Sequence, residues 1–525
     1  MRAFSELLDN LICTPQRNGR IRLLINYFEK EKDPNRGWAV AILTGGLELP
    51  NAKTSVIRSL ISVRTDQKLF ELSYEYVGDL AETVSLLWPN TSNNKTHLNL
   101  TNVIKDLQKA NRKTFYELVE NTLDKIDTSE RFAFLKLIMG NLRVGVSGRL
   151  VKLALAEYGN KEPSEIEELW FGLKPPYKDL FAWLEAKAPP PIINDKLIFR
   201  PLMLANPITK DALMDLEHQN FVAEWKWDGI RAILVGDGKE CKLYSRTGDD
   251  IGQAFPDIVR LTKFKGVVDG ELLIVREGVV APFNDLQKRL GRKKPSKNLL
   301  KEYPAHFRVY DMLFNHDIDL RSKSLIDRRT KLKDWVDAVA STQIDFSSQI
   351  NFSSWEELSA IRDQARENGI EGLMLKQINS PYLPGRPKGP WFKWKRDPLV
   401  ADCVLMYAQR GHGKRSSFYS DYTFGCWRST VDGVDELVPV GKAYSGFTNT
   451  ELVEIDRWVR ANGKERFGPV RAVEVGLVFE VAFDAVHLSS RHKSGLAMRF
   501  PRIHRIRWDK PAQEADRVEG LLELV

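Results

Sequence analysis

The sequence has 525 residues, of which 43% are hydrophobic and 28% are charged. This length exceeds what one hydrophobic core supports, so about three domains are expected. The net charge of +8 favours a polyanionic partner only weakly, because 78 basic residues are set against 70 acidic ones. Four scattered cysteines without a C-x-x-C pair argue against a zinc ribbon or a disulfide framework. No signal peptide and no apolar run of roughly 20 residues is visible, so we expect no membrane segment.

Residues 1–195 are predicted to be mostly helical, because apolar residues recur there at helical spacing. Ser147 is placed to cap a helix over 148–158, which Gly159 would end. The segment Leu142-Arg143-Val144-Gly145 offers an arginine and a glycine where backbone could approach a phosphate. A helix-to-helix turn with a solvated arginine explains this segment equally well.

A domain boundary is predicted within residues 187–207. The run Ala188-Pro189-Pro190-Pro191 favours a stiff, extended hinge. After this hinge the pattern changes from helices to short strands, which indicates a second domain.

One stretch of the next segment, Glu224 to Arg231, lies between two short apolar strands and reads Glu-Trp-Lys-Trp-Asp-Gly-Ile-Arg. Taken alone, its Asp-Gly pair predicts a charged hairpin turn. Further charged residues follow at strand ends and turns in a fixed order, and separate turns would not produce this ordered set. These are Arg246, Asp269-Gly270-Glu271, Tyr310-Asp311, Glu371-Gly372 and the alternating Lys393 and Lys395, which a strand places on one face.

Residues 399–525 are predicted to form a small β-barrel. A helix over 450–462, with Thr448 or Asn449 as its cap, interrupts the strands. Short strands with one helix fit an OB-fold. The candidate strands are Ala401–Ala408, Tyr422–Trp427, Glu436–Ala443 and Glu474–Ala485.

The ordered motifs resemble those of the covalent lysyl-nucleotide superfamily, which comprises DNA ligases, RNA ligases and mRNA capping enzymes. Lys226-Trp227-Asp228-Gly229 resembles the nucleophile motif, and the charged sets that follow resemble motifs three to five. The run Arg499 to Lys510 is similar to the sixth motif of ATP-dependent DNA ligases, which separates them from capping enzymes. The resemblance covers nearly the whole chain and is greatest to bacterial ligases of three-domain type.

This resemblance implies a fold and a domain order. Residues 1–195 would be an all-α DNA-binding domain, and residues 196–398 an α+β nucleotidyltransferase (adenylation) domain. Residues 399–525 would be an all-β OB-fold domain. The barrel would be mobile, because arginines near Arg499 must leave before DNA occupies the site.

The resemblance also implies a role for each matched residue. Lys226 would attack the α-phosphorus of ATP, which requires the neutral amine and therefore neighbouring cations. Glu271 and Glu371 would bind Mg²⁺ or another divalent cation. The family has an arginine where this sequence has Pro387, so Arg386, one residue earlier, takes the assignment. The nucleotide-binding set is Glu224, Arg231, Arg246, Glu271, Tyr310, Arg386, Lys393, Lys395 and Arg499.

The implied activity is ATP-dependent sealing of nicks between 5′-phosphate and 3′-hydroxyl ends in duplex DNA. The implied setting is a monomer in the bacterial cytoplasm, working in replication, repair or recombination, with protein partners that the sequence does not identify. An RNA ligase or capping enzyme shares the lysine motif, but this form of the sixth motif and the helical N-terminal domain argue against both. An NAD-dependent ligase would have its own nicotinamide module, and a DNA-binding scaffold would have lost Lys226.

Overall fold

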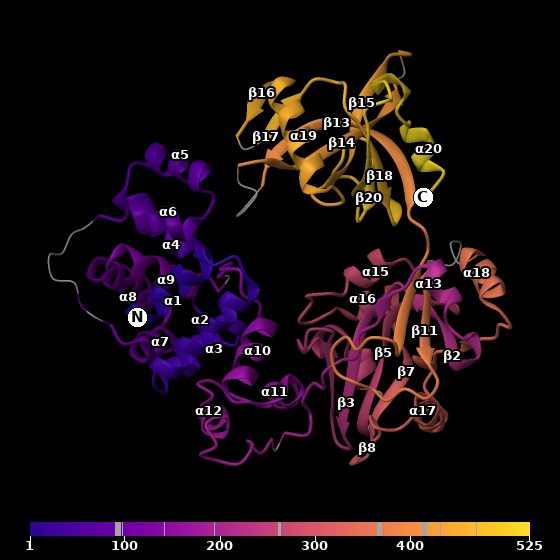
Figure 1. The fold of residues 1–525 in the computed structure, drawn as a ribbon, viewed down its shortest axis with the longest axis horizontal. Helices are drawn as coiled ribbons and strands as arrows, with labels where there is room; N and C mark the ends of the chain where they lie inside the picture. Colours follow the sequence, from indigo (N-terminus) through magenta and orange to yellow (C-terminus); the bar gives the residue numbers. More distant parts are fainter. Residues whose placement is uncertain are drawn as a thin grey trace. The chain divides into compact units, whose positions relative to one another are not determined.

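The computed structural model describes the chain except residues 90–95, 97, 141, 194, 261–263, 365–369, 412–416, 431 and 469. It divides into two compact units, and Figure 1 shows the elements coloured along the sequence. One unit combines Met1–Ile61 with Trp88–Arg396, and the other combines Ser62–Leu87 with Asp397–Val525.

The N-terminal region is helical, and its described residues contain no strand before β1. Helix α10 confirms the predicted bounds: the Ser147 hydroxyl accepts a hydrogen bond from the Leu150 backbone N–H, and Gly159 follows the last turn. The helices are α1 (Arg2–Cys13), α2 (Arg17–Lys30), α3 (Asn35–Thr44), α4 (Thr54–Arg64), α5 (Gln67–Val77), α6 (Leu80–Leu87), α7 (Leu100–Lys109), α8 (Arg112–Lys125), α9 (Thr128–Met139), α10 (Gly148–Tyr158), α11 (Pro163–Trp170) and α12 (Lys178–Leu184).

The turn between α9 and α10 contains the arginine-bearing segment predicted above. Leu142 and Val144 are buried, while Arg143 is exposed and has a positive φ of 50°. Gly145 also has a positive φ, and its carbonyl accepts a hydrogen bond of 2.6 Å from Arg20. Two apolar anchors therefore hold this turn and leave Arg143 facing solvent.

The central segment forms two sheets of predominantly antiparallel strands. The first has the order β1-β12-β11-β2-β10, and the second has the order β4-β3-β5-β7-β8 with β6 beside β5 and β9 beside β7. Their strands are β1 (Asn206–Pro207), β2 (Phe221–Trp227), β3 (Ile230–Asp237), β4 (Cys241–Ser245), β5 (Lys265–Arg276), β6 (Val279–Val280), β7 (Ala305–Asn315), β8 (Ile318–Asp319), β9 (Ile344–Phe346), β10 (Gln349–Ile350), β11 (Ile370–Gln377) and β12 (Trp391–Lys395). The helices are α13 (Lys210–Met214), α14 (Pro256–Val259), α15 (Phe283–Gln287), α16 (Lys297–Glu302), α17 (Leu325–Val339) and α18 (Trp355–Gln364).

Alternation along the strands sorts the side chains of these sheets into layers. One face of the first sheet packs with α13 and α18 around Trp394. One face of the second sheet packs with α14, α15 and α17 around Phe307. A third apolar cluster joins both sheets through Ile233 of β3 and Trp391 of β12. The facing surfaces also carry charged side chains, among them Lys226 of β2, Arg231 of β3 and Glu271 of β5, so the polar site lies between the sheets.

The Asp228-Gly229 turn does not close a hairpin, so that interpretation is wrong. Strand β2 pairs with β10 and β11, whereas β3 pairs with β4 and β5. The chain therefore crosses from the first sheet to the second directly after Trp227, one residue beyond Lys226. It returns between Phe346 of β9 and Gln349 of β10.

The C-terminal region, Asp397–Val525, is a β domain with a helix packed on it. The predicted helix is confirmed as α19 (Asn449–Ala461), capped by Thr448 in a capping box with Glu451. The predicted strand over 474–485 is wrong in its first part, because residues 474–477 form a turn before β18. The other elements are β13 (Leu399–Arg410), β14 (Tyr419–Ser429), β15 (Asp435–Ala443), β16 (Gly463–Phe467), β17 (Val470–Val473), β18 (Val478–Phe483), β19 (Ala485–Leu488), β20 (Leu496–Arg499), β21 (Arg502–Arg507) and α20 (Val518–Leu522). None of the described helices is long and apolar enough to cross a bilayer.

Candidate active site

Lys226 lies on the face of β2 that is turned toward the second sheet. Its Nζ donates a hydrogen bond of 2.5 Å to Oε2 of Glu371 on β11. The Nζ of Lys395 on β12 lies 3.7 Å from the same oxygen. Lys226 and Lys395 both stand opposite Gly372 in the ladder, so three adjacent strands bring these charges together.

Gly372 must be a glycine for this arrangement. Its φ is +136°, and a β-carbon there would lie 2.4 Å from the Trp394 carbonyl oxygen. The register between β11 and β2 shifts between Ile370 and Gly372, which marks a β-bulge at Glu371. A bulge redirects one side chain, and here it turns the Glu371 carboxylate toward Lys226.

Lys393 is surrounded by positive charge. Burial lowers its pKa, and the charges of Arg386, Lys395, Lys226 and Arg246 lower it further. Both Arg386 and Arg246 are exposed and are contributed by loops. Cations gathered at this density repel one another and are suited to binding an anion such as a polyphosphate.

Glu224 is almost fully buried, with 1% of its surface exposed, and three donors surround its carboxylate. Arg329 of α17 pairs with Oε1, Lys376 donates to both oxygens at 3.1 and 3.2 Å, and Ser347 donates to Oε2 at 3.1 Å. These donors occupy most of the acceptor capacity of the carboxylate. The Lys376 ammonium also lies 4.2 Å from the centre of the Tyr310 ring.

Arg231 of β3 is fixed by a buried acid on the neighbouring strand. It makes two parallel hydrogen bonds to Asp269, at 2.7 and 3.1 Å, and Tyr382 donates to the same carboxylate at 2.8 Å. The Arg231 guanidinium lies 5.8 Å from the ring centres of both Tyr310 and Trp391. The geometry thus places an arginine and two aromatic rings together between the sheets.

Asp311, directly after Tyr310, forms a fully buried ion pair. Arg328 of α17 donates to both of its oxygens at 2.8 and 2.9 Å, and neither side chain is exposed. Arg328 also donates to the carbonyls of Lys323 and Ser380. This pair links β7 to α17 behind the Tyr310 ring.

Glu271 of β5 lies beside the same cluster. Burial raises its pKa to about 8, the positive charges of Lys226 and Arg231 oppose this shift, and the negative charges of Asp269 and Glu371 add to it. Glu271 is therefore mostly protonated at neutral pH when no cation is bound.

The carboxylates of Glu271 and Glu371 are suitable ligands for a divalent cation. Mg²⁺ commonly takes one or two carboxylates and completes its shell with water and substrate phosphates. Glu271 and Glu371 come from opposite sheets and interact electrostatically. No group of three or more metal-binding side chains occurs among the described residues. An ion held by these two carboxylates would therefore depend on substrate oxygens.

We expect the metal-free protein to lose stability as pH rises. Between about pH 4.5 and pH 8 the folded state keeps a proton on Glu271 that the unfolded state has released, so stability falls with rising pH. The loss is at most about 5 kcal/mol. Melting temperatures of wild type and Glu271→Gln, measured at about pH 5.5 and pH 8.5 with a chelator, test this effect. Equal pH dependence of the two proteins would contradict it.

The structure brings most of the predicted residues together within the first compact unit, and one predicted residue belongs to the other unit. Arg499 lies at the end of β20 in the second compact unit. Sequence reasoning missed Arg328, Arg329, Ser347 and Tyr382, which hold the predicted acids. The sequence offered one indication of these partners, the adjacent Arg328 and Arg329 in a polar helix, and adjacent arginines in such a helix are usually solvated.

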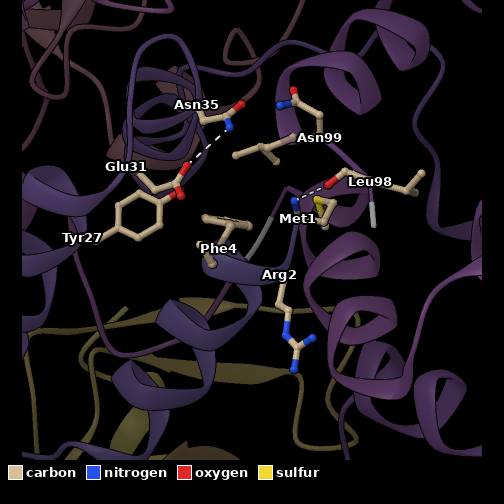
Figure 2. Close-up of a pocket in the computed structure, with 10 residues that line it drawn as sticks. Met1, Arg2, Phe4, Tyr27, Glu31, Asn35, Leu98 and Asn99 are labelled. Atoms are coloured by element: carbon tan, nitrogen blue, oxygen red, sulfur yellow. Dashed lines mark hydrogen bonds between the residues drawn. The ribbon is translucent and has the colours of Figure 1, made fainter. Parts of the chain in front are cut away.

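A depression of about 340 Å³ lies elsewhere, in the helical region (Figure 2). Figure 2 shows Asn35 bonded to Glu31 and the Met1 amine bonded to the Leu98 carbonyl. None of the predicted site residues lines it. This depression is therefore not part of the predicted site.

Three family models match the chain. The model for the DNA ligase N terminus matches residues 1–156, and that for the ATP dependent DNA ligase domain matches residues 202–395. The model for the ATP dependent DNA ligase C terminal region matches residues 415–510. Together they cover the helical region, the two-sheet domain with Lys226, and the C-terminal β domain.

Individual relatives, one over the whole chain and one over part of it, agree with these matches. A probable DNA ligase of Koribacter versatilis is 30% identical over 100% of this chain and 96% of its own length. A DNA ligase of Archaeoglobus fulgidus is 34% identical over 59% of this chain and 56% of its own length. The solved structure named Pmar-Lig_Pre. is similar in fold, with a TM-score of 0.62 at 15% identity, over 97% of this chain and 99% of that one. The chain therefore belongs to the ATP-dependent DNA ligases, which use ATP and a divalent metal to seal DNA nicks through a lysyl-AMP intermediate.

Proposed function

We propose that Lys226 is the residue that carries AMP in this ligase. The observation that supports this assignment is the position of its Nζ, which lies between the two sheets against Glu371, with the Lys395 ammonium 3.7 Å from the same carboxylate oxygen. Lys226 also belongs to the group of cations, with Arg386, Lys395 and Arg246, that surrounds Lys393. These cations would hold the ATP phosphates and stabilise the charge that develops on them. A bound Mg²⁺ would add Lewis-acid stabilisation at the same phosphates.

In the first step the Lys226 amine attacks the α-phosphorus. A P–N bond forms, the bond between the α-phosphorus and the bridging oxygen breaks, and pyrophosphate leaves. Lys226 forms an ion pair with Glu371, so the amine must lose a proton and separate from this carboxylate before it attacks. AMP then passes to the 5′-phosphate of the nick, and attack by the 3′-hydroxyl releases it.

The remaining site residues would bind the nucleotide. Tyr310 would stack on the purine, while Arg231 and Arg246 would contact ribose and phosphate. Glu224 would select adenine by accepting a hydrogen bond from the exocyclic amine of the base. This requires one of the three donors that now bind the Glu224 carboxylate to give up its hydrogen bond. Lys393, Lys395, Arg386 and Arg499 would contact phosphates, and Glu271 and Glu371 the metal.

We assign residues 1–195 to an all-α DNA-binding domain, 196–398 to the adenylation domain and 399–525 to an OB-fold. Supporting the first boundary, no helix or strand is described between Leu184 and Asn206. Supporting the OB-fold, α19 falls between β15 and β16 of one seven-stranded sheet. We further propose a cytoplasmic monomer that acts in replication or repair.

Labelling with ATP tests the Lys226 assignment. Label at the α-phosphorus should remain on denatured wild-type protein, label at the γ-phosphorus should not, and mass spectrometry should place AMP on the peptide that contains Lys226. Nicked DNA should then remove the label. AMP mapped to Lys393 or Lys395 would refute the assignment, and absence of retained label would refute the covalent mechanism for this chain.

A further inference from the structure

The segment 288–301, here called the basic loop, carries an unusual concentration of positive charge. It contains seven lysines and arginines and no acidic residue, while the whole chain has a net charge of +8. The loop therefore accounts for almost all of the net positive charge. No residue assigned above to bind the nucleotide, the metal or the reacting phosphates lies within the loop.

Two of the seven cations are structural. Arg289 is fully buried and donates to Asp257 at 2.6 and 3.0 Å, to the Ala254 carbonyl and to the Tyr303 carbonyl. Lys288 donates to the Tyr303 hydroxyl at 2.7 Å and to Asp285. These bonds tie the start of the loop to Tyr303, just beyond its end, and they hold α15 next to α16 as Figure 1 shows.

The other five cations point to a partner outside the chain. Within the described residues, no acidic side chain forms an ion pair with any of them, and all are exposed. They are Arg292, Lys293, Lys294, Lys297 and Lys301. A surface segment that only faces solvent usually carries acidic residues among its basic ones, and this loop has no acidic residue.

The basic run near the C-terminus provides a contrast. There Arg505 pairs with Glu480 at 2.8 Å, while Arg507 and Lys510 pair with Asp402 at 3.0 and 2.7 Å. Acids of the same chain thus neutralise that run. The basic loop keeps its charge on a rigid base, which is the arrangement that binds a phosphate backbone without reading sequence.

The position of the loop fits duplex DNA that extends away from the nick. Arg276, the last residue of β5, pairs with Asp285 of α15 at 2.8 Å and donates to the Glu302 carbonyl. Glu271 lies five residues earlier on the same strand. Five residues of an extended strand span roughly 17 Å, which is the length of about five base pairs of duplex.

We propose that the basic loop is a second DNA-contact surface of the adenylation domain, which clamps duplex phosphates at least about five base pairs from the nick. This inference rests on the ligase reaction, because the reacting phosphate defines where the nick lies. The loop binds the substrate and takes no part in nucleotide chemistry.

The test compares two triple variants with equal loss of charge. Arg292→Gln/Lys293→Gln/Lys294→Gln removes the tip of the loop. The control, Lys239→Gln/Lys331→Gln/Lys333→Gln, removes exposed lysines of the same domain, two of which already pair with Asp334 and Asp337. Binding to a nicked duplex is measured against salt concentration, and self-adenylylation is measured without DNA.

The loop variant should bind nicked DNA roughly 10- to 100-fold more weakly. When the logarithm of its association constant is plotted against the logarithm of the salt concentration, the slope should be smaller in magnitude by about two to three. Its self-adenylylation should match wild type. Shortening the duplex arms from about twelve to about four base pairs should weaken wild type but barely affect the variant. An Arg292→Lys variant should bind like wild type.

Three results would overturn the proposal. These are a salt dependence equal to that of wild type, equal weakening by the control variant, or equal loss of self-adenylylation, which would place the loop at the nucleotide. Failure of wild type to adenylylate itself would instead refute the Lys226 assignment, so the two failures are distinguishable.

Discussion

Replacing Lys226 with alanine should abolish nick sealing that starts from ATP, with a loss of roughly 10⁴-fold or more. The amine supplies the bond to AMP, and no neighbouring group can replace it, because Lys393 and Lys395 stand on a different strand. Lys226→Arg should fail equally, since arginine keeps the charge beside Glu371 but is not nucleophilic. Sealing of nicked duplex by gel electrophoresis provides the measurement.

A substrate that already carries AMP on its 5′-phosphate makes this prediction specific. The Lys226 variants should seal such a nick far better than an unmodified nick with ATP, because only the last step is then required. Lys333→Ala, which changes an exposed lysine of the same domain, provides the control. If Lys226→Ala seals unmodified nicks with ATP, then another residue carries the nucleotide.

Replacing Arg328 with methionine should lower the free energy of unfolding by about 3 to 5 kcal/mol, because it leaves Asp311 buried without its partner. The carbonyls of Lys323 and Ser380 lose their donor as well. Asp311 follows Tyr310 directly, so we also expect the Michaelis constant for ATP to rise. Urea unfolding, followed by fluorescence, measures the stability effect.

Two further variants separate charge burial from a general effect of substitution. Arg328→Met/Asp311→Leu should recover part of the loss, because no unpaired charge remains in the interior. Lys333→Met, which breaks the exposed pair with Asp337, should cost less than about 1 kcal/mol. Equal effects of Arg328→Met and Lys333→Met would show that the buried pair adds no special stability.

Local signals predicted much of the fold. The cap at Ser147, the helix α19 and the common face of Lys393 and Lys395 depend on nearest neighbours and periodicity, and the structure confirms them. The strand expected over 474–485 failed in its first part, because a turn at 474–477 interrupts an otherwise apolar run. Periodicity alone does not place such a break.

The partners of the site residues could not be predicted. Glu224 meets Arg329 across 105 positions of sequence, and Lys226 meets Glu371 across 145. The sequence contains the charges but does not indicate which strands are neighbours. It equally did not reveal that β2 and β3 belong to different sheets, since an Asp-Gly turn between strands favours a hairpin.

The two crossings between the sheets have a consequence for protein engineering. The second sheet, Ile230 to Phe346, is one continuous insertion into the first, and its junctions lie next to Lys226 and at Ser347, which contacts Glu224. A chimaera that exchanges this insertion between related ligases would therefore have both of its seams inside the active site. Recombination points placed in surface loops such as residues 238–240 would spare the catalytic geometry and still exchange part of the sheet.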